Sequence, residues 1–226
     1  MFKMKKTIGV IGLGRFGIEL VQYLSELHVE LIAIDKDIEA VKQAGVFADN
    51  VAACDITNEI QLKETGIAEA DHVIIAIGQD KMENLSTAIL TILRLKQLGV
   101  KEITARADKD DYIEILKKVG ADYVVSPLMI AAERTASKIG AGNVIDYFNI
   151  KNDFDVYEIE VSEQFEATHI TNLVIREKFL ANILLIQRNG QVLIPTSEET
   201  IYPNDHIFIF GRQKDIPKVI AYFSKK

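Results

Sequence analysis

The stretch TIGVIGLGRFGIELVQYL, residues 7–24, decides the fold. A short strand-like run, 7–11, leads into three glycines spaced as Gly12-x-Gly14-x-x-Gly17, and a helical pattern follows them. A glycine-rich turn between a strand and a helix is typical of sites that hold the phosphates of an adenine nucleotide. The stretch therefore predicts a nucleotide-binding domain, and the question is whether its nucleotide is a redox reagent or a signal.

The alternation of strand and helix continues through the first half of the chain. Short runs rich in Val and Ile predict strands, and segments with apolar residues at i, i+3 and i+4 predict helices between them. The predicted strands are 7–11, 29–34, 50–54, 71–77, 102–107 and 122–126, and the predicted helices are 15–27, 37–44, 58–65, 81–98 and 109–118. Strands buried on both faces and separated by helices predict an α/β fold with a doubly wound, parallel, Rossmann-like sheet.

In the second half of the chain the predicted strands and helices no longer alternate regularly. A helix predicted over about 128–140 precedes it. Strands are then predicted at 155–161, 182–188, 191–195 and 206–211, with helices at about 170–179 and 213–223 and an Asn-Gly hairpin turn within 188–191. This order predicts a small α+β domain. We expect a nucleotide-binding domain over 5–127, a crossover helix and hinge over 128–147, and a second domain over 148–226.

Four residues give the nucleotide site its predicted geometry. Gly12 permits the tight turn, Gly14 lets the backbone approach a phosphate, and Gly17 lets the helix pack closely on the strand. Asp35 follows the second strand, 18 residues after Gly17, and is placed to accept hydrogen bonds from both ribose hydroxyls. Because an acid at this position repels a 2′-phosphate, NADP is disfavoured.

Further candidates lie in the loop and at the ends of the other strands. Arg15 would reach a terminal phosphate, which arginine holds with paired contacts, and Arg106 would add a second charge. The alternative for each arginine is a solvated surface position without a ligand. Asp55 ends the third strand, where an adenine or ribose edge would lie, and its alternative role is to start a turn. The candidate cofactor-binding residues are Gly12, Leu13, Gly14, Arg15, Phe16, Gly17, Asp35, Lys36, Asp55, Ala76, Ile77, Gly78 and Arg106.

Composition and missing motifs exclude several classes of protein. The chain has 226 residues and a net charge of −7, which argues against a nucleic-acid partner. Its one cysteine, Cys54, excludes a disulfide framework.

No apolar run approaches the roughly 20 residues that span a bilayer, so we expect a cytoplasmic protein. His169 and His206 lack a recognisable acid–base partner, so we predict no enzyme; an NAD(H)-dependent oxidoreductase or redox sensor is the alternative.

Motifs in both halves resemble those of the KtrA/TrkA family, cytosolic RCK-type regulatory subunits of bacterial potassium uptake systems. They are VIGLGRFG (10–17), AIDKD (33–37), DHVIIAIG (71–78), KKVGADYVVSP (117–127) and NVIDYFNI (143–150), the last matching the family's hinge. The resemblance implies an RCK N-terminal domain and a TrkA C-terminal domain. It also implies dimers that form an octameric ring on a membrane potassium pore subunit of the KtrB/TrkH type, at the inner face of the membrane. In this family ATP favours the conducting state and ADP or NAD other states, without chemistry on the nucleotide.

The resemblance also implies a second ligand. In several Gram-positive relatives the C-terminal domain binds cyclic di-AMP at its dimer interface, which inhibits transport. The matching candidates here are Ile170, Val174, Arg176, Asn182, Ile183, Leu184 and Pro195. Val174 replaces an aspartate of the relatives, which removes an acceptor. Leu128 replaces a glutamate that helps to hold a divalent cation beside the phosphates, so we predict no metal site. The preference among ATP, ADP and NAD(H) stays open.

Overall fold

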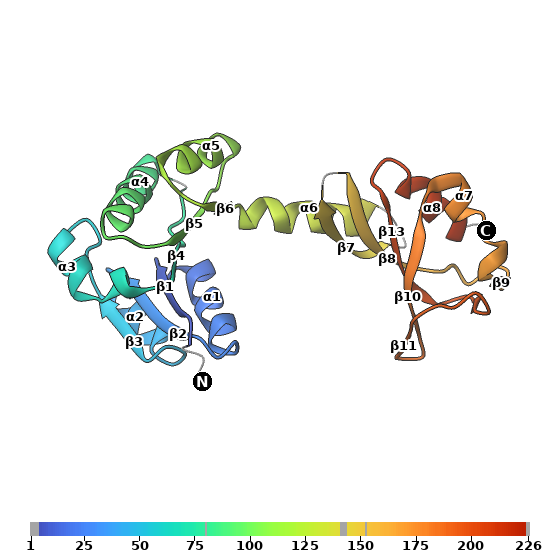
Figure 1. The fold of residues 1–226 in the computed structure, drawn as a ribbon, viewed down its shortest axis with the longest axis horizontal. Coiled ribbons are helices and arrows are strands. Elements are labelled where there is room, and N and C mark those ends of the chain that lie inside the picture. Colours follow the sequence, from blue (N-terminus) through green and yellow to red (C-terminus); the bar gives the residue numbers. More distant parts are fainter. Residues whose placement is uncertain (1–4, 80, 141–143, 152, 225–226) are drawn as a thin grey trace. The chain divides into compact units, whose positions relative to one another are not determined.

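The structure, a computed structural model, describes residues 5–79, 81–140, 144–151 and 153–224. It divides into two compact units, Met1–Met129 and Ile130–Lys226. Figure 1 gives the order of the helices and strands along the chain. None of the described helices has the length and apolarity needed to cross a membrane.

The first unit is built on a parallel sheet of six strands in the order β3-β2-β1-β4-β5-β6. The strands are β1 (Thr7–Ile11), β2 (Glu30–Asp35), β3 (Asn50–Ala53), β4 (His72–Ile75), β5 (Glu102–Arg106) and β6 (Tyr123–Val125). This is the order of the dinucleotide-binding fold, and the winding direction changes between β1 and β4. The predicted doubly wound parallel sheet is confirmed.

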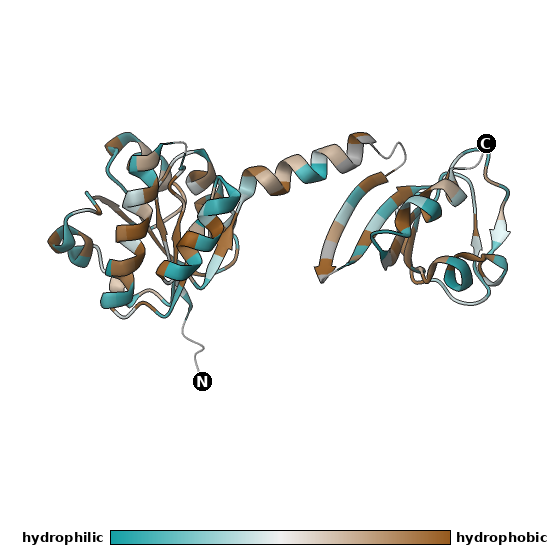
Figure 2. Ribbon diagram, turned by 90° about the horizontal axis from the view of Figure 1, so that it is seen from above, coloured by the Kyte–Doolittle hydropathy of each residue, from teal (hydrophilic) through white to brown (hydrophobic). Residues whose placement is uncertain are grey.

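Helices cover both faces of this sheet. They are α1 (Arg15–Ser25), α2 (Ile38–Ala44), α3 (Glu59–Glu64), η1 (Ile67–Glu69), α4 (Met82–Gln97) and α5 (Asp110–Val119). Side chains of β2 alternate between two cores: Leu31 and Ala33 pack with α1 and α2, whereas Ile32 and Ile34 pack with α4 and α5. Burial on both faces explains why the strands are continuously apolar, as the brown strands in Figure 2 show.

The second unit contains most of α6 (Pro127–Gly140) and an antiparallel sheet in the order β11-β10-β13-β8-β7. Its strands are β7 (Val144–Lys151), β8 (Phe154–Glu160), β10 (Asn182–Arg188), β11 (Gln191–Leu193) and β13 (His206–Arg212). A second pair joins β9 (Thr168–His169) to β12 (Thr200–Ile201), and the helices are η2 (Ile170–Asn172), α7 (Ile175–Phe179) and α8 (Ile216–Phe223).

The predicted hairpin is confirmed. Arg188 of β10 pairs with Gln191 of β11, and both turn residues, Asn189 and Gly190, have the positive φ that this tight turn requires.

Two segments of the second unit differ from the elements expected from the sequence. No strand was predicted over Val144–Lys151, which forms β7 and pairs with β8, and the hinge role of 143–150 stays a prediction. Register shifts at both ends of this pairing break the period-two pattern that would have revealed a strand. The helix predicted over 170–179 is interrupted at Leu173, whose extended backbone separates η2 from α7 and turns its side chain into the core.

Candidate functional site

The glycine loop lies at the end of β1, where the winding direction of the sheet changes. Gly12 has a φ of +93°, a conformation that favours glycine. A Cβ on Gly17 would clash with the carbonyl oxygen of Gly12, so glycine is needed for α1 to begin this close to the strand. Gly14 is the N-cap of α1, and a Cβ there would meet nothing within 4 Å. The loop therefore leaves open space at the helix N-terminus, where this fold holds phosphates.

Asp35 ties the end of β2 to the loop. Its Oδ2 accepts a hydrogen bond from the Leu13 N–H at 2.6 Å, and its Oδ1 accepts one from the Asp37 N–H at 2.9 Å. Each carboxylate oxygen keeps a further lone pair, so ribose hydroxyls can still donate to the same group. The carboxylate is thus both a brace for the loop and an available acceptor.

The end of β4 lies directly against the loop. The Ala76 N–H donates to the carbonyl oxygen of Ile11 at 2.7 Å, and a Cβ on Gly12 would lie 3.0 Å from the Ile77 nitrogen. Next along the chain, Gly78 accepts a hydrogen bond from the Asn84 side chain at 2.8 Å. The structure therefore places the predicted residues from β1 and β4 together at one edge of the sheet.

Arg106, the last residue of β5, joins the same edge. Its Cζ lies 5.7 Å from the centre of the Phe16 ring, within the range of a cation–π contact. The guanidinium also covers Gly78, where a Cβ would lie 3.6 Å from Nη1. One side chain from β5 thus contacts both the glycine loop and the end of β4.

Arg15, Lys36 and Asp55 are exposed at the periphery of this edge. The Asp55 carboxylate accepts hydrogen bonds from the hydroxyl and the backbone N–H of Thr57, at 2.7 and 2.9 Å, and these bonds lower the pKa of the carboxyl. Asp55 therefore starts a turn, and its predicted adenine or ribose contact stays a prediction. Burial raises the pKa of the neighbouring Cys54 thiol, which disfavours the reactive thiolate.

Two polar residues at this edge were missed by the sequence interpretation. Asp108 accepts hydrogen bonds from the Arg106 Nε at 2.7 Å and from the Gln79 backbone N–H at 2.6 Å. The Gln79 side chain is fully buried and donates to the Arg106 carbonyl oxygen at 2.6 Å. The only available signal was the arginine–aspartate spacing after β5, which belongs to no named motif.

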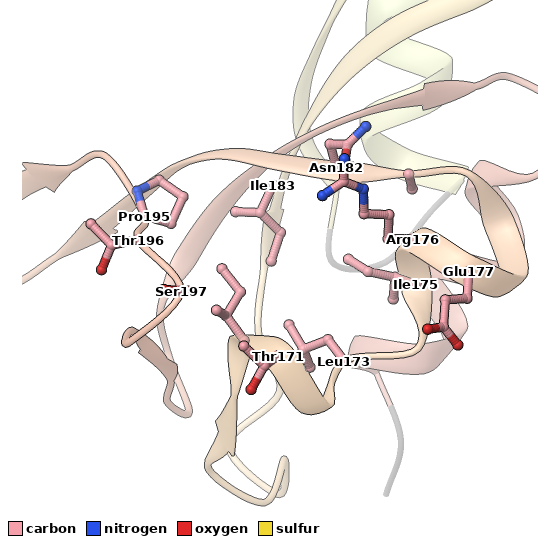
Figure 3. Close-up of a pocket in the computed structure, with 12 residues that line it drawn as sticks. Thr171, Leu173, Ile175, Arg176, Glu177, Asn182, Ile183, Pro195, Thr196 and Ser197 are labelled. Atoms are coloured by element: carbon pink, nitrogen blue, oxygen red, sulfur yellow. The ribbon is translucent and has the colours of Figure 1, made fainter.

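The second unit holds a pocket of about 440 Å³ between η2, α7, the start of β10 and the segment after β11 (Figure 3). Among its lining residues are five of the seven cyclic di-AMP candidates, namely Ile170, Arg176, Asn182, Ile183 and Pro195. In Figure 3 the Arg176 side chain extends from α7 toward β10. Among the described residues, no ion pair neutralises this guanidinium.

The remaining two candidates lie elsewhere. Val174 is the N-cap residue of α7, and Leu184 is exposed at a register shift in β10. Neither lines the pocket, whereas Thr171, Glu177, Thr196 and Ser197, which the sequence interpretation did not include, do.

The histidines of the second unit have structural partners. His206 lies 3.2 Å from Glu158 on the neighbouring strand, and His169 lies 2.6 Å from the Thr171 hydroxyl. Within 5–79, 81–140, 144–151 and 153–224, no three His, Cys, Asp or Glu residues are grouped to hold a metal ion. Leu128 is exposed in the first turn of α6.

Two family models match the chain, the TrkA-N domain over residues 8–127 and the TrkA-C domain over residues 156–224. Ktr system potassium uptake protein C of Bacillus subtilis (strain 168) is 38% identical over 216 residues, 95% of this chain and 96% of that protein. Ktr system potassium uptake protein A of the same organism is 30% identical over 214 residues, 94% of this chain and 95% of that protein.

Solved structures share the fold at lower identity. The crystal structure of the GsuK RCK domain is 20% identical with a TM-score of 0.52, covering 98% of this chain and 48% of that one. The GsuK channel bound to NAD is 22% identical with a TM-score of 0.50, covering 99% of this chain and 39% of that one. Because the two domain models together match most of the chain and the Bacillus proteins match it almost from end to end, the chain belongs to the TrkA family that includes the Ktr potassium uptake proteins.

Proposed function

We propose that this protein is the nucleotide-sensing regulatory subunit of a potassium uptake system. The observation that carries the proposal is the braced glycine loop: Asp35 bonds to the loop backbone, and Gly14 leaves open space before the N-terminus of α1. An adenine nucleotide fits this arrangement, with its ribose on Asp35 and its phosphates on the loop and on Arg15. The nucleotide acts as a ligand and is not consumed, so the protein is not an enzyme.

The ligands we propose are ATP and ADP, with NAD(H) as the further candidate. Two cationic side chains, Arg15 and Arg106, lie in the glycine loop and at the end of β5. Clustered arginine favours a terminal phosphate, which ATP and ADP carry and a dinucleotide does not. NAD remains in the set because a protein of the same fold, the GsuK channel, has been solved bound to it.

The assembly we propose follows from the family. Dimers of the chain form an octameric ring in the cytoplasm, and the ring docks on a potassium pore subunit of the KtrB/TrkH type at the inner face of the membrane. Ktr system potassium uptake proteins C and A are relatives over almost their whole length, which supports this partner. ATP and ADP shift the ring between shapes because they bind the two shapes unequally.

A second input in the C-terminal unit is supported by the pocket there. Its lining combines apolar side chains such as Ile170 and Ile183 with polar ones, and Arg176 offers a guanidinium without an ion-pair partner among the described residues. An anionic ligand with large planar bases suits such a lining. We propose cyclic di-AMP as this ligand, although Val174 supplies no acceptor.

The experiment is calorimetric titration of nucleotide-stripped protein with ATP, ADP and NADH. We expect ATP and ADP to bind, and Asp35→Ala to weaken both by at least about tenfold through the loss of charge-assisted hydrogen bonds. The matched control is Asp49→Ala, which removes the same charge from an exposed position near the end of α2. Equal binding by the Asp35 and Asp49 variants would refute the site, and binding of NADH alone would refute adenine-nucleotide gating.

A parallel titration addresses the second pocket. We expect cyclic di-AMP to bind the full chain and Arg176→Ala to weaken that binding, while ADP binding is unchanged. An isotherm that Arg176→Ala leaves intact would place the dinucleotide elsewhere.

A further inference from the structure

A closed set of polar contacts among Arg106, Asp108 and Gln79 lies beside the candidate nucleotide site. Asp108 is one-tenth exposed and Gln79 is fully buried. The Asp108 carboxylate bonds to the Arg106 side chain through Oδ1 and to the Gln79 backbone through Oδ2. The Gln79 amide closes the set by donating to the Arg106 carbonyl oxygen. The Gln79 backbone N–H therefore holds one oxygen of the carboxylate, and the other oxygen faces the guanidinium.

The set leaves the outer part of Arg106 available. Among the described residues, Nε is the only guanidinium nitrogen of Arg106 with a hydrogen bond. The guanidinium lies near Phe16 and Gly78, two residues of the candidate site. The terminal nitrogens thus keep their donors at the edge of the sheet that carries the glycine loop. A guanidinium held in this way loses little rotational freedom when it meets an oxyanion.

Gln79 supplies an independent observation. Its Oε1 is buried and has no hydrogen-bond partner within the described part of the chain. The short contact between Nε2 and the Arg106 carbonyl fixes which end of the amide carries oxygen. A buried acceptor of this kind is costly unless a donor from a ligand or a water reaches it. The Gln79 oxygen can therefore accept a hydrogen bond from a hydroxyl of a ligand or from a water.

We propose that Asp108 is a positioning residue, which orients the Arg106 guanidinium toward a phosphate of the nucleotide bound at the glycine loop. This inference rests on the proposed function and deepens it. Asp108 does not touch the nucleotide and acts only through Arg106 and Gln79. Arg106 then contacts the phosphate with its terminal nitrogens, and Asp108 keeps it from swinging into solvent.

Whether Asp108→Asn tightens or weakens nucleotide binding distinguishes a positioning role of Asp108 from simple charge repulsion. A carboxylate near a phosphate repels it, so removal of the Asp108 charge by Asp108→Asn would tighten nucleotide binding if Coulomb interaction alone acted. If positioning dominates, the same substitution weakens binding, because an asparagine cannot accept from both the Arg106 Nε–H and the Gln79 N–H through two oxygens. Asp110→Asn is the matched control, since it removes an equal charge from an exposed position at the start of α5.

The test titrates adenosine, ADP and ATP into the wild-type protein and the two variants. With Asp108→Asn we expect ADP and ATP to bind about tenfold more weakly and adenosine within about twofold of wild type, because adenosine carries no phosphate. With Asp110→Asn we expect all three ligands to bind as tightly as to wild type, or slightly more tightly. Equal or tighter ADP binding by Asp108→Asn would overturn the inference, and so would an equal loss of adenosine binding, which indicates a merely structural role.

A double-mutant cycle links the effect to Arg106. Arg106→Gln should weaken ADP binding in the wild-type background and add little in the Asp108→Asn background, because both changes remove the same contact. Additive losses would show that Asp108 acts independently of Arg106, and they would overturn the inference. If the wild-type protein bound no adenine nucleotide, the proposed function would fail and the inference with it; if wild type bound ADP but Asp108→Asn did so equally well, the inference alone would fail.

Discussion

At the scale of single residues, Gly12, Gly14 and Gly17 serve different purposes although one motif contains them all. Gly17 is required by packing, because a side chain would clash with the carbonyl oxygen of Gly12. Gly14 faces open space, which under the proposed function leaves room for a phosphate. The motif thus combines a folding requirement with a binding requirement.

Substitution should separate the two requirements. We expect Gly17→Ala to lower the free energy of unfolding of the first unit by about 2–4 kcal/mol, because α1 must move away from β1. Gly14→Ala should change the free energy of unfolding by less than about 0.5 kcal/mol, because its backbone is extended at φ −67° and its Cβ would be unobstructed. Denaturant unfolding measures both. Equal destabilisation by the two substitutions would contradict the packing account.

At the scale of elements, an ion pair in the second unit ties β10 to the residue before β13, and the same arginine bonds to β12. Arg188 of β10 bonds to both carboxylate oxygens of Asp205 at 2.8 Å and to the Thr200 carbonyl at 2.8 Å. Asp205 is almost fully buried and also accepts the Tyr202 N–H. The pair therefore fixes the chain that follows the pocket segment after β11.

We expect Asp205→Asn to destabilise the second unit by about 2–4 kcal/mol, because the arginine then lacks its paired acceptor. Glu199→Gln is the control, since Glu199 lies 3.7 Å from the same arginine and is partly exposed; its effect should stay below about 1 kcal/mol. Hydrogen exchange of β10 and β13 amides measures the loss of protection. Unchanged protection in Asp205→Asn would show that packing alone holds these strands.

A histidine on β4 makes the stability of the first unit depend on pH. Burial lowers the pKa of His72, although Glu102 at 3.1 Å favours the charged form. The ring therefore takes up a proton less readily in the folded protein than in the unfolded chain, which binds one below about pH 6.5. Stability is present above that pH and is lost as the pH falls.

The expected result is a larger fall in melting temperature between pH 7.5 and 5.5 for wild type than for His72→Gln, which carries no titrating ring. Melting curves at the two pH values measure this difference. A wild-type fall no larger than that of the variant would contradict a lowered pKa of His72 in the folded protein.

The two units differ in how far the sequence predicted their elements. The strands of the first unit are buried on both faces, so their continuous Val and Ile runs stand out, and predicted ends such as Ile11 match the structure. Strand β7 was missed because bulges interrupt its alternation, and the helix over 170–179 was mispredicted because Leu173 satisfies helical spacing while its backbone is extended.

The candidate site also contains residues that the sequence predicted and residues that it did not. The sequence pointed to Asp35 and the glycines because their spacing is a local pattern with a known mechanism. Asp108 and Gln79 were not predicted as site residues because they come into contact only when β4 and β5 pair in the sheet. Contacts between distant segments leave no periodic trace in the sequence.

At the scale of the whole molecule, each nucleotide site of the proposed ring needs only a weak preference for one ring shape over the other, because the preferences of all the sites multiply. A shift from 1:99 to 99:1 between two shapes needs a total preference of about 10⁴. If eight equivalent sites act on one equilibrium, a preference of about threefold per site supplies it, since about 3⁸ approaches that factor. Small changes in phosphate contacts, such as those of Arg106, are therefore enough to change the state of the ring.

The most direct test of the central claim is rubidium flux into vesicles that contain a potassium pore subunit of the KtrB/TrkH type, with the protein added in ATP, in ADP or without nucleotide. Asp35→Ala, and its control Asp49→Ala, are measured in parallel. The account predicts that flux with wild type and with Asp49→Ala is higher in ATP than in ADP, and that Asp35→Ala abolishes the difference. Equal flux in ATP, in ADP and without nucleotide, through a pore that the protein demonstrably binds, would contradict the account.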